Sequence, residues 1–203
     1  MIDRPWPVAL AGEWRGRRIV LRPLRVHADR REFLLLRQDN AAWNGPWDSS
    51  TPNRAAKSMS FAQLVRRQDE EAKAGRLLPF ALEVDGALAG QVHLSGISRG
   101  ALLSGALGYW IAESLAGQGI TPYAVALVND HAFGPLGLHR VEVNVRPDNT
   151  ASLRVVAKLR MRDEGVRRAY LHVDGRWHDH RSFALTVEDL AGRTAVERLS
   201  RFV

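Results

Sequence analysis

The sequence contains no cysteine among its 203 residues. This absence excludes disulfide-stapled scaffolds, thiolate zinc sites and every mechanism that uses a cysteine nucleophile. Long apolar runs are also missing, because the longest weakly polar stretch, Ala101–Ala112, is interrupted by Ser104, Gly105 and Gly108. No segment is therefore predicted to cross a membrane. The first six residues lack the apolar core of a secretory signal, so a cytoplasmic protein is expected.

Acidic residues are fewer than basic ones, 22 against 29, which gives a formal net charge of +7. A basic surface favours polyanionic partners such as phosphates, nucleotides or nucleic acid, without distinguishing among them. With 45% apolar and 25% charged residues, the composition is that of a globular protein. Because repeats and low-complexity linkers are absent, we expect a single domain over residues 1–203, with a core of about 18–187 and a helical tail at 188–203.

Hydrophobic periodicity and turn residues predict a mixed α/β chain around one sheet, with helices crossing between strands. Asp85-Gly86 and Asp174-Gly175 are two-residue turn signals that predict hairpins. The predicted strands are Ile19–Leu24, Phe80–Val84, Leu88–Leu94, Ala106–Ala112, Val141–Val145, Tyr170–Val173 and Phe183–Val187. The predicted helices are one opened by Asp29, then Pro52–Gly75, Gly119–Phe133, Asn149–Leu159 and an amphipathic tail helix through Val196, Leu199 and Val203 that docks on the body, with a loop at Trp43–Asp48.

A glycine turn joins a predicted strand to a predicted helix at Ala116–Pro122 (AGQGITP). The first N–H groups of a helix have no partner within it and the helix dipole favours an anion, so the turn is suited to a phosphate. The pattern is not a dinucleotide-binding fingerprint, which needs a third glycine where Pro122 stands, and it lacks the Gly-Lys-Ser/Thr of a P-loop. A plain connection between strand and helix is the alternative interpretation.

Three segments, taken in order, carry a family resemblance. They are Gly108–Pro122, which contains the glycine turn, Leu138–Ser152 (LHRVEVNVRPDNTAS) and Tyr170–His180 (YLHVDGRWHDH). Together they resemble the GNAT (Gcn5-related) N-acetyltransferase superfamily, and specifically its RimJ/RimL type, which acetylates the N-termini of ribosomal proteins. The resemblance spans about 18–187. It implies the GNAT fold, which is a single central, mostly antiparallel, twisted sheet with splayed middle strands and helices on both faces.

The resemblance also implies an activity. Acetyl-CoA would be the co-substrate, without a metal, and the acetyl group would pass to a protein N-terminal α-amine by direct attack on the thioester in a ternary complex. The acceptor would be a protein N-terminus, such as that of a ribosomal protein, with the ribosome or RNA close by, and the chain would be a monomer or a homodimer. A small-molecule amine acetyltransferase, or a non-catalytic protein that binds acyl-CoA or ribosomes, remains the alternative, since a fold does not determine the acceptor.

The resemblance implies where CoA would bind. The pyrophosphate would lie on the backbone of the glycine turn and the pantetheine arm beside the preceding strand and the next helix, which assigns Gly117, Gln118, Gly119, Ile120, Thr121, Tyr109, Trp110, Ile111, Asn149 and Ser152 to the cofactor. The family pattern Gln/Arg-x-x-Gly-x-Gly/Ala is not matched at Ala116 and Thr121. Arg160 also replaces a usual glycine after the short helix, which predicts a strained left-handed cap or a shifted helix end.

Acetyl transfer needs a proton donor for the departing thiolate. Asn149 is the predicted N-cap of the short helix. Ser152 lies three residues after it, on the sheet-facing stripe of that helix, which suits the role of proton donor. The alternative is a serine that only makes a hydrogen bond in a first helical turn. Many superfamily members place a catalytic tyrosine on this helix, where this chain has Val155-Val156, so that role falls elsewhere or is absent.

Acetyl transfer also needs a base for the amine. Glu142 and Asn144 share one face of a predicted strand, which suggests a lined cavity. Glu142 would take the amine proton through water if partial burial raised its pKa. On an exposed edge, solvent would cover both side chains instead. Glu113 is a weaker candidate base.

The segment between the first two predicted helices is where this family forms its acceptor site. Trp43 and Trp47 would supply apolar walls, and Asp48 would hold an N-terminal ammonium group; packing anchors are the alternative. The spacing of His172, His178 and His180 matches no zinc signature, so no metal is expected. The basic run at 15–18 is interpreted as a solvated patch or, alternatively, a contact with RNA or acidic protein.

Overall fold

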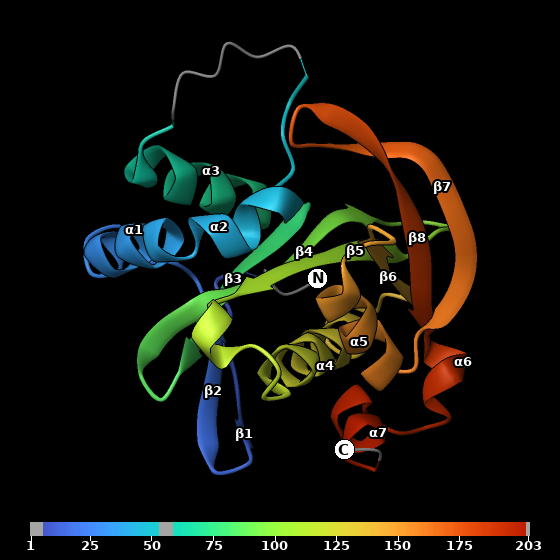
Figure 1. The fold of residues 1–203 in the computed structure, drawn as a ribbon. Coiled ribbons are helices and arrows are strands. Elements are labelled where there is room, and N and C mark those ends of the chain that lie inside the picture. The colour runs from blue at the N-terminus through green and yellow to red at the C-terminus, as the bar shows by residue number, and fades with distance from the viewer. Residues whose placement is uncertain (1–5, 53–58, 202–203) are drawn as a thin grey trace.

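The computed structural model describes residues 6–52 and 59–201. Within these residues eight strands form one sheet in the order β1-β2-β3-β4-β5-β6-β8-β7, antiparallel except for the pair β5–β6 (Figure 1). The strands are β1 (Leu10–Trp14), β2 (Arg17–Arg22), β3 (Leu77–Val84), β4 (Ala87–Ser98), β5 (Ser104–Ile111), β6 (Arg140–Val145), β7 (Arg162–Val173) and β8 (Arg176–Thr186). The helices are α1 (Arg30–Asp39), α2 (Ala41–Asn44), α3 (Phe61–Lys73), α4 (Ile120–Phe133), α5 (Thr150–Lys158), α6 (Val187–Leu190) and α7 (Ala195–Ser200), with 3₁₀ turns η1 (Gly45–Trp47) and η2 (Glu113–Leu115).

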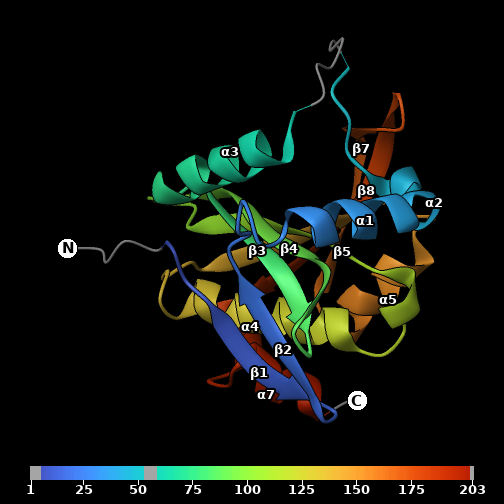
Figure 2. The same ribbon diagram turned by 90° about the vertical axis from the view of Figure 1, so that its left-hand side faces the viewer.

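Helices cover both faces of the sheet. Helices α1, α2 and α3 lie on one face, and α4 and α5 lie on the other (Figures 1 and 2). Strand β3 shows why both layers are needed, since Phe80 and Leu82 belong to the large core with α4 while Ala81 packs with Phe33 and Phe61 on the opposite face. Successive strand residues point to opposite faces, so a strand apolar on both sides must be covered twice.

The middle of the sheet opens between β5 and β6. Their parallel ladder runs from the pair Ser104–Arg140 to the pair Leu107–Val143 and ends there. Strand β5 nevertheless continues to Ile111, paired only with β4. The predicted splay of the middle strands is therefore confirmed, and it leaves a wedge of backbone open between β5 and β6.

Both predicted hairpins are confirmed, and their turns have positive φ at both central residues. The values are 51° and 91° at Asp85 and Gly86, and 47° and 78° at Asp174 and Gly175, as a type I′ turn requires. A third turn of this kind, Arg15-Gly16 with φ of 53° and 78°, joins β1 to β2. The sequence did not predict β1 because Arg-Gly lacks the Asn-Gly or Asp-Gly signature of such turns.

Two predicted element boundaries are wrong. The segment Trp43–Asp48 is not a loop, because α2 and η1 form two short helical turns there. Helix α3 begins at Phe61 rather than at Pro52, after a capping box in which Ser60 Oγ accepts from Gln63 N–H (3.3 Å) and Gln63 Oε1 accepts from Ser60 N–H (2.9 Å). Residues 53–58 of the predicted helix lie outside the described residues.

Strands β7 and β8 are much longer than predicted. Only their ends at Tyr170–Val173 and Phe183–Val187 were expected, and Val187 itself begins α6. Strand β7 is the edge of the sheet, is mostly exposed and is bulged at two places, so it carries no apolar alternation for a sequence pattern to detect.

The C-terminal segment packs on α4 through α7. The Asp130 carboxylate accepts the backbone N–H groups of Ala195 (2.5 Å) and Val196 (3.2 Å), and Leu199 is buried. Val203, the last residue of the predicted stripe, lies outside the described residues. No helix in the described part of the chain combines the length and apolar character that a membrane span needs.

Candidate active site

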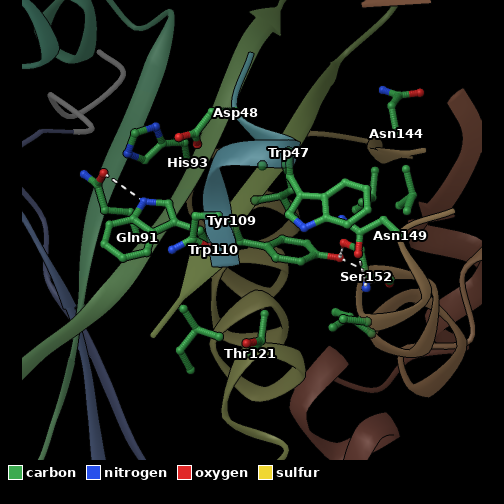
Figure 3. A pocket seen from close by; sticks show the side chains of 18 of the residues that line it. Trp47, Asp48, Gln91, His93, Tyr109, Trp110, Thr121, Asn144, Asn149 and Ser152 are labelled. Atoms are coloured by element: carbon green, nitrogen blue, oxygen red, sulfur yellow. Dashed lines mark hydrogen bonds between the residues drawn. The ribbon is translucent and has the colours of Figure 1, made fainter. Parts of the chain in front are cut away.

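A pocket of about 920 Å³ opens where β5 and β6 diverge. It is bounded by α1, α2, η1 and α3 on one side and by the starts of α4 and α5 on the other (Figure 3). The predicted site residues that line it are Trp43, Trp47, Asp48, Tyr109, Trp110, Ile111, Gly117, Gly119, Ile120, Thr121, Asn144, Asn149 and Ser152. Glu142 and Gln118 are the two predicted site residues that do not line it.

The glycine turn forms one end of the pocket. Gly117 and Gly119 both adopt left-handed backbone, with φ of 78° and 80°. A Cβ at Gly119 would lie 2.9 Å from Trp14 Nε1, whereas a Cβ at Gly117 would meet no atom within 4 Å. Gly119 is thus required for packing, and Gly117 borders open space in the pocket.

The backbone of this turn is suited to an anion. The N–H groups of residues 117–121 donate to no other group in the described part of the chain, and they lie at the start of α4, where the helix dipole is positive. The Gln118 side chain turns away from the pocket, since its Nε2 donates to Ser114 O (3.0 Å) and its Oε1 accepts from Arg17 Nη1 (3.0 Å). Gln118 therefore offers a ligand only its backbone, and the turn fits a pyrophosphate.

Tyr109 and Ser152 meet beside the wedge, where α5 packs next to β5. Asn149 Oδ1 accepts the Ser152 N–H (3.0 Å), which confirms the predicted N-cap, and the Ser152 hydroxyl donates to the Tyr109 hydroxyl oxygen (2.9 Å) (Figure 3). Burial raises the pKa of Tyr109, outweighing the opposite effect of the Ser152 hydrogen bond, so the phenol stays protonated at neutral pH. The site therefore contains a tyrosine, but on β5 and not on α5, the short helix where many superfamily members place it.

The structure does not bring Glu142 to the pocket. Its carboxylate accepts from Arg140 Nε (2.9 Å) and from Arg167 Nη2 (2.7 Å), and its strand lies between β5 and β8. The expectation of a Glu142 facing a lined cavity is therefore wrong, and so is the alternative of an exposed edge, because β7 supplies Arg167 across β8. Glu113 does not line the pocket either.

Asn144, two residues further along β6, does reach the pocket. Its Oδ1 accepts from Ser182 Oγ (2.6 Å), and its Nδ2 donates to the Tyr170 hydroxyl (3.5 Å). These contacts hold Asn144 at the junction of β6, β7 and β8.

The other side of the pocket is built by α1, α2 and η1. Asp48 pairs with Arg37, whose guanidinium lies 4.9 Å from the centre of the Trp110 ring. Arg146 lies 4.9 Å from the Trp47 ring and donates to Pro46 O (3.0 Å). An ammonium group would therefore have to compete with Arg37 for Asp48, and the Trp47 ring packs against Arg146, the residue that follows β6.

Sequence reasoning missed three polar residues on this side, Asn44, Gln91 and His93. Asn44 Nδ2, Gln91 Nε2 and His93 Nε2 are buried and have no hydrogen-bond partner among residues 6–52 and 59–201. Gln91 Oε1 accepts from Trp110 Nε1 (3.2 Å), which orients the indole. A signal was available, because Gln91 and His93 alternate with Val92 and Leu94 on a strand that is central in the sheet.

The three C-terminal histidines make ordinary contacts. His172 Nδ1 pairs with Ser50 Oγ (2.8 Å), and His180 Nδ1 pairs with His178 O (3.0 Å). Among the described residues no group of three or more His, Asp or Glu is arranged to hold a metal ion.

Comparison with known proteins identifies the family. The model of the acetyltransferase (GNAT) domain family matches residues 18–162. The chain belongs to the GNAT acetyltransferase family. It is 34% identical over 181 residues to the probable N-acetyltransferase YjcK of Bacillus subtilis (strain 168), covering 86% of this chain and 97% of that protein. It is 32% identical over 100 residues to the [ribosomal protein uS5]-alanine N-acetyltransferase of Escherichia coli (strain K12), covering 49% and 52% of the two chains.

A solved structure extends this likeness. The structure of Mycobacterium smegmatis RimJ in complex with CoA-disulfide has a TM-score of 0.88 and 35% identity, covering 97% of this chain and 95% of that chain. These matches confirm the predicted fold and the predicted class of enzyme, a GNAT N-acetyltransferase of RimJ type with acetyl-CoA as co-substrate.

Proposed function

We propose that this protein transfers the acetyl group of acetyl-CoA to the N-terminal α-amine of a protein, and that a ribosomal protein is the acceptor. The E. coli relative is named for acting on ribosomal protein uS5, and the solved neighbour is a RimJ. The observation that carries the proposal is a pocket with two ends. One end is the glycine turn, which is suited to an anion, and the other is a chamber lined by aromatic and polar side chains. The hydroxyl pair of Tyr109 and Ser152 lies where the two ends meet.

The CoA end uses backbone more than side chains. We assign the pyrophosphate to the N–H groups of residues 117–121, and the pantetheine arm to the β5 backbone at Tyr109, Trp110 and Ile111, which has no strand partner on the β6 side. Bound there, acetyl-CoA supplies an activated acetyl group at the wedge of the sheet. The Ser152–Tyr109 pair then lies on the α5 side, where it can give a proton to the leaving sulfur.

The acceptor end supports a peptide rather than a simple alkylamine. Asn44 Nδ2 and Gln91 Nε2 are buried donors without a partner in the described chain, and both line the pocket. A buried donor left unpaired costs about 1–3 kcal/mol, so a ligand that brings hydrogen-bond acceptors is favoured. The first carbonyl groups of a polypeptide are such acceptors, and Trp43 and Trp47 wall the same chamber.

The test measures acetyl transfer to a panel of acceptors. CoA release gives the rate, and mass spectrometry identifies the product. Peptides with free N-termini of ribosomal proteins should be acetylated once, at the α-amine. The same peptides with a formylated N-terminus are the matched control and should stay unmodified even when they contain lysine. Acetylation of small amines with no activity on any free N-terminus would overturn the proposal.

A further inference from the structure

The surroundings of His93 differ from those of an ordinary strand histidine. On the neighbouring strands it pairs with Pro79 of β3 and with Gly108 of β5. Cross-strand partners project to the same face of a sheet, and a Cβ at Gly108 would meet no atom within 4 Å. The position beside His93 on β5 therefore carries no side chain, and the imidazole lines the pocket from β4 together with Gln91 (Figure 3).

Burial, and no charged neighbour, accounts for the low pKa of the His93 imidazole in the described chain. His93 Nε2 is buried without a partner in the described chain, which is unusual because buried polar atoms are nearly always hydrogen-bonded. Burial lowers the pKa of His93 to about 4, so the ring is neutral near pH 7 and one ring nitrogen carries a free lone pair. The titratable or cationic side chains that line the same pocket from other elements are Arg37, Asp48, Tyr109, Arg146, Arg154, Lys158, Tyr170 and His180.

We propose that His93 Nε2 accepts the proton that the attacking amine loses during acetyl transfer. The inference rests on the proposed function for its acceptor. It gives His93 the role of base that the sequence suggested for Glu142, which does not line the pocket. The neutral amine nitrogen bonds to the acetyl carbonyl carbon, one N–H proton passes to His93, and the carbon–sulfur bond breaks. The sulfur takes a proton through the Ser152–Tyr109 pair, the pair regains a proton from water, and His93 returns its proton to water.

The two proton sites lie on opposite sides of β5, as the reaction needs. Residues 108 and 110 share a face with Gln91 and His93, whereas Tyr109 points to the other face and meets α5. The acceptor enters on the first face and the thiol leaves near the second. A weak base suffices, because an amine nitrogen that is bonding to carbon becomes positively charged and strongly acidic.

The test compares two buried histidines. His93→Gln keeps a polar side chain that cannot take a proton, and kcat should fall by about 10²–10⁴-fold while the KM for acetyl-CoA changes little. The matched control is His131→Gln on α4, since His131 Nε2 is also buried without a partner in the described chain but lies outside the pocket. Its kcat should stay near the parental value, and calorimetry with CoA verifies that each variant is folded.

Chemical rescue separates proton transfer from a structural role. In His93→Ala, added imidazoles should restore transfer, and the restored rate should rise with the basicity of the imidazole used. His93→Asn, a smaller polar substitution, serves if either variant loses CoA binding. Parental kcat in His93→Gln overturns the inference, and so does a loss that no imidazole restores. If the protein acetylates small amines and no peptide, the proposed acceptor is wrong, while the same comparison with that amine still decides the role of His93.

Discussion

Removal of the two hydroxyls at the wedge should reveal whether they act as one proton donor. The Ser152 hydroxyl donates to the Tyr109 hydroxyl across 2.9 Å, and both line the pocket. Two groups in one hydrogen-bonded relay are expected to be non-additive, because loss of either interrupts it. Ser152→Ala and Tyr109→Phe should each slow kcat by about 10²-fold, or about 2.7 kcal/mol, and the double variant should be only slightly slower than either. The coupling energy would then approach about 2.7 kcal/mol.

Stability should change little in Ser152→Ala. The cap bond from Ser152 N–H to Asn149 Oδ1 uses the backbone and survives, so the variant loses about one hydrogen bond, on the order of 1 kcal/mol. The assay is steady-state CoA release with acetyl-CoA and an acceptor peptide, run in parallel with urea denaturation. An acyl donor whose thiol is more acidic needs less protonation, so it should partly restore both single variants.

Two results would refute this reasoning. Parental kcat in Ser152→Ala would reduce the serine to a helix-terminus residue. A double variant slowed by about 10⁴-fold would show that the two hydroxyls act independently, since independent effects multiply.

Three further predictions concern the glycine turn, the cap of α5 and the buried imidazole. Gly117→Asp should bind CoA about tenfold more weakly than Gly117→Asn, because the two side chains have similar shape at an open position and differ in charge beside the pyrophosphate; equal affinities in calorimetry would contradict the assignment. Arg160 has a φ of 52°, so Arg160→Gly should raise the free energy of unfolding by about 0.5–1 kcal/mol in urea, and no gain would show that the strain is absent. The pKa of His93 is about 4 in the folded protein against 6.5 for a free imidazole, so its contribution to stability is complete above about pH 6.5 and is lost as the pH falls toward 4, at up to about 1.4 kcal/mol per pH unit. In His93→Gln, the free energy of unfolding should not fall by this amount between pH 6.5 and pH 4. If its pH dependence equals that of the parent, the His93 imidazole is not buried as described.

Features that depend only on residues close together in the chain could be predicted from the sequence. The glycine turn, the Asn149 cap and the two Asp-Gly hairpins depend on neighbouring residues, and each appears in the structure where it was expected. The strained cap is of the same kind, since Arg160 takes the left-handed conformation that the missing glycine predicted.

Features that depend on convergence of distant segments could not be predicted. Tyr109 and Ser152 are 43 residues apart, and only the packing of α5 against the wedge brings their hydroxyls together. Glu142 satisfied the strand pattern for a lined cavity, but Arg167, 25 residues away, occupies its carboxylate. The charge partners of a side chain are set by neighbouring strands, and a single-strand pattern carries no information about them.

The contact of Trp14 with the glycine turn connects the N-terminal hairpin to the segment that we assign to the CoA pyrophosphate. Trp14 donates to Gln118 O (3.3 Å) and stacks on Tyr123 of α4 at 5.0 Å between ring centres, so β1 supports the glycine turn from behind. A local opening that frees Trp14 would release the turn, and a ligand that fixes the turn would hold β1 in place. Amide hydrogen exchange in β1 thus becomes a reporter of cofactor occupancy, and a fusion or truncation near residue 10 is expected to affect CoA affinity before it affects the core.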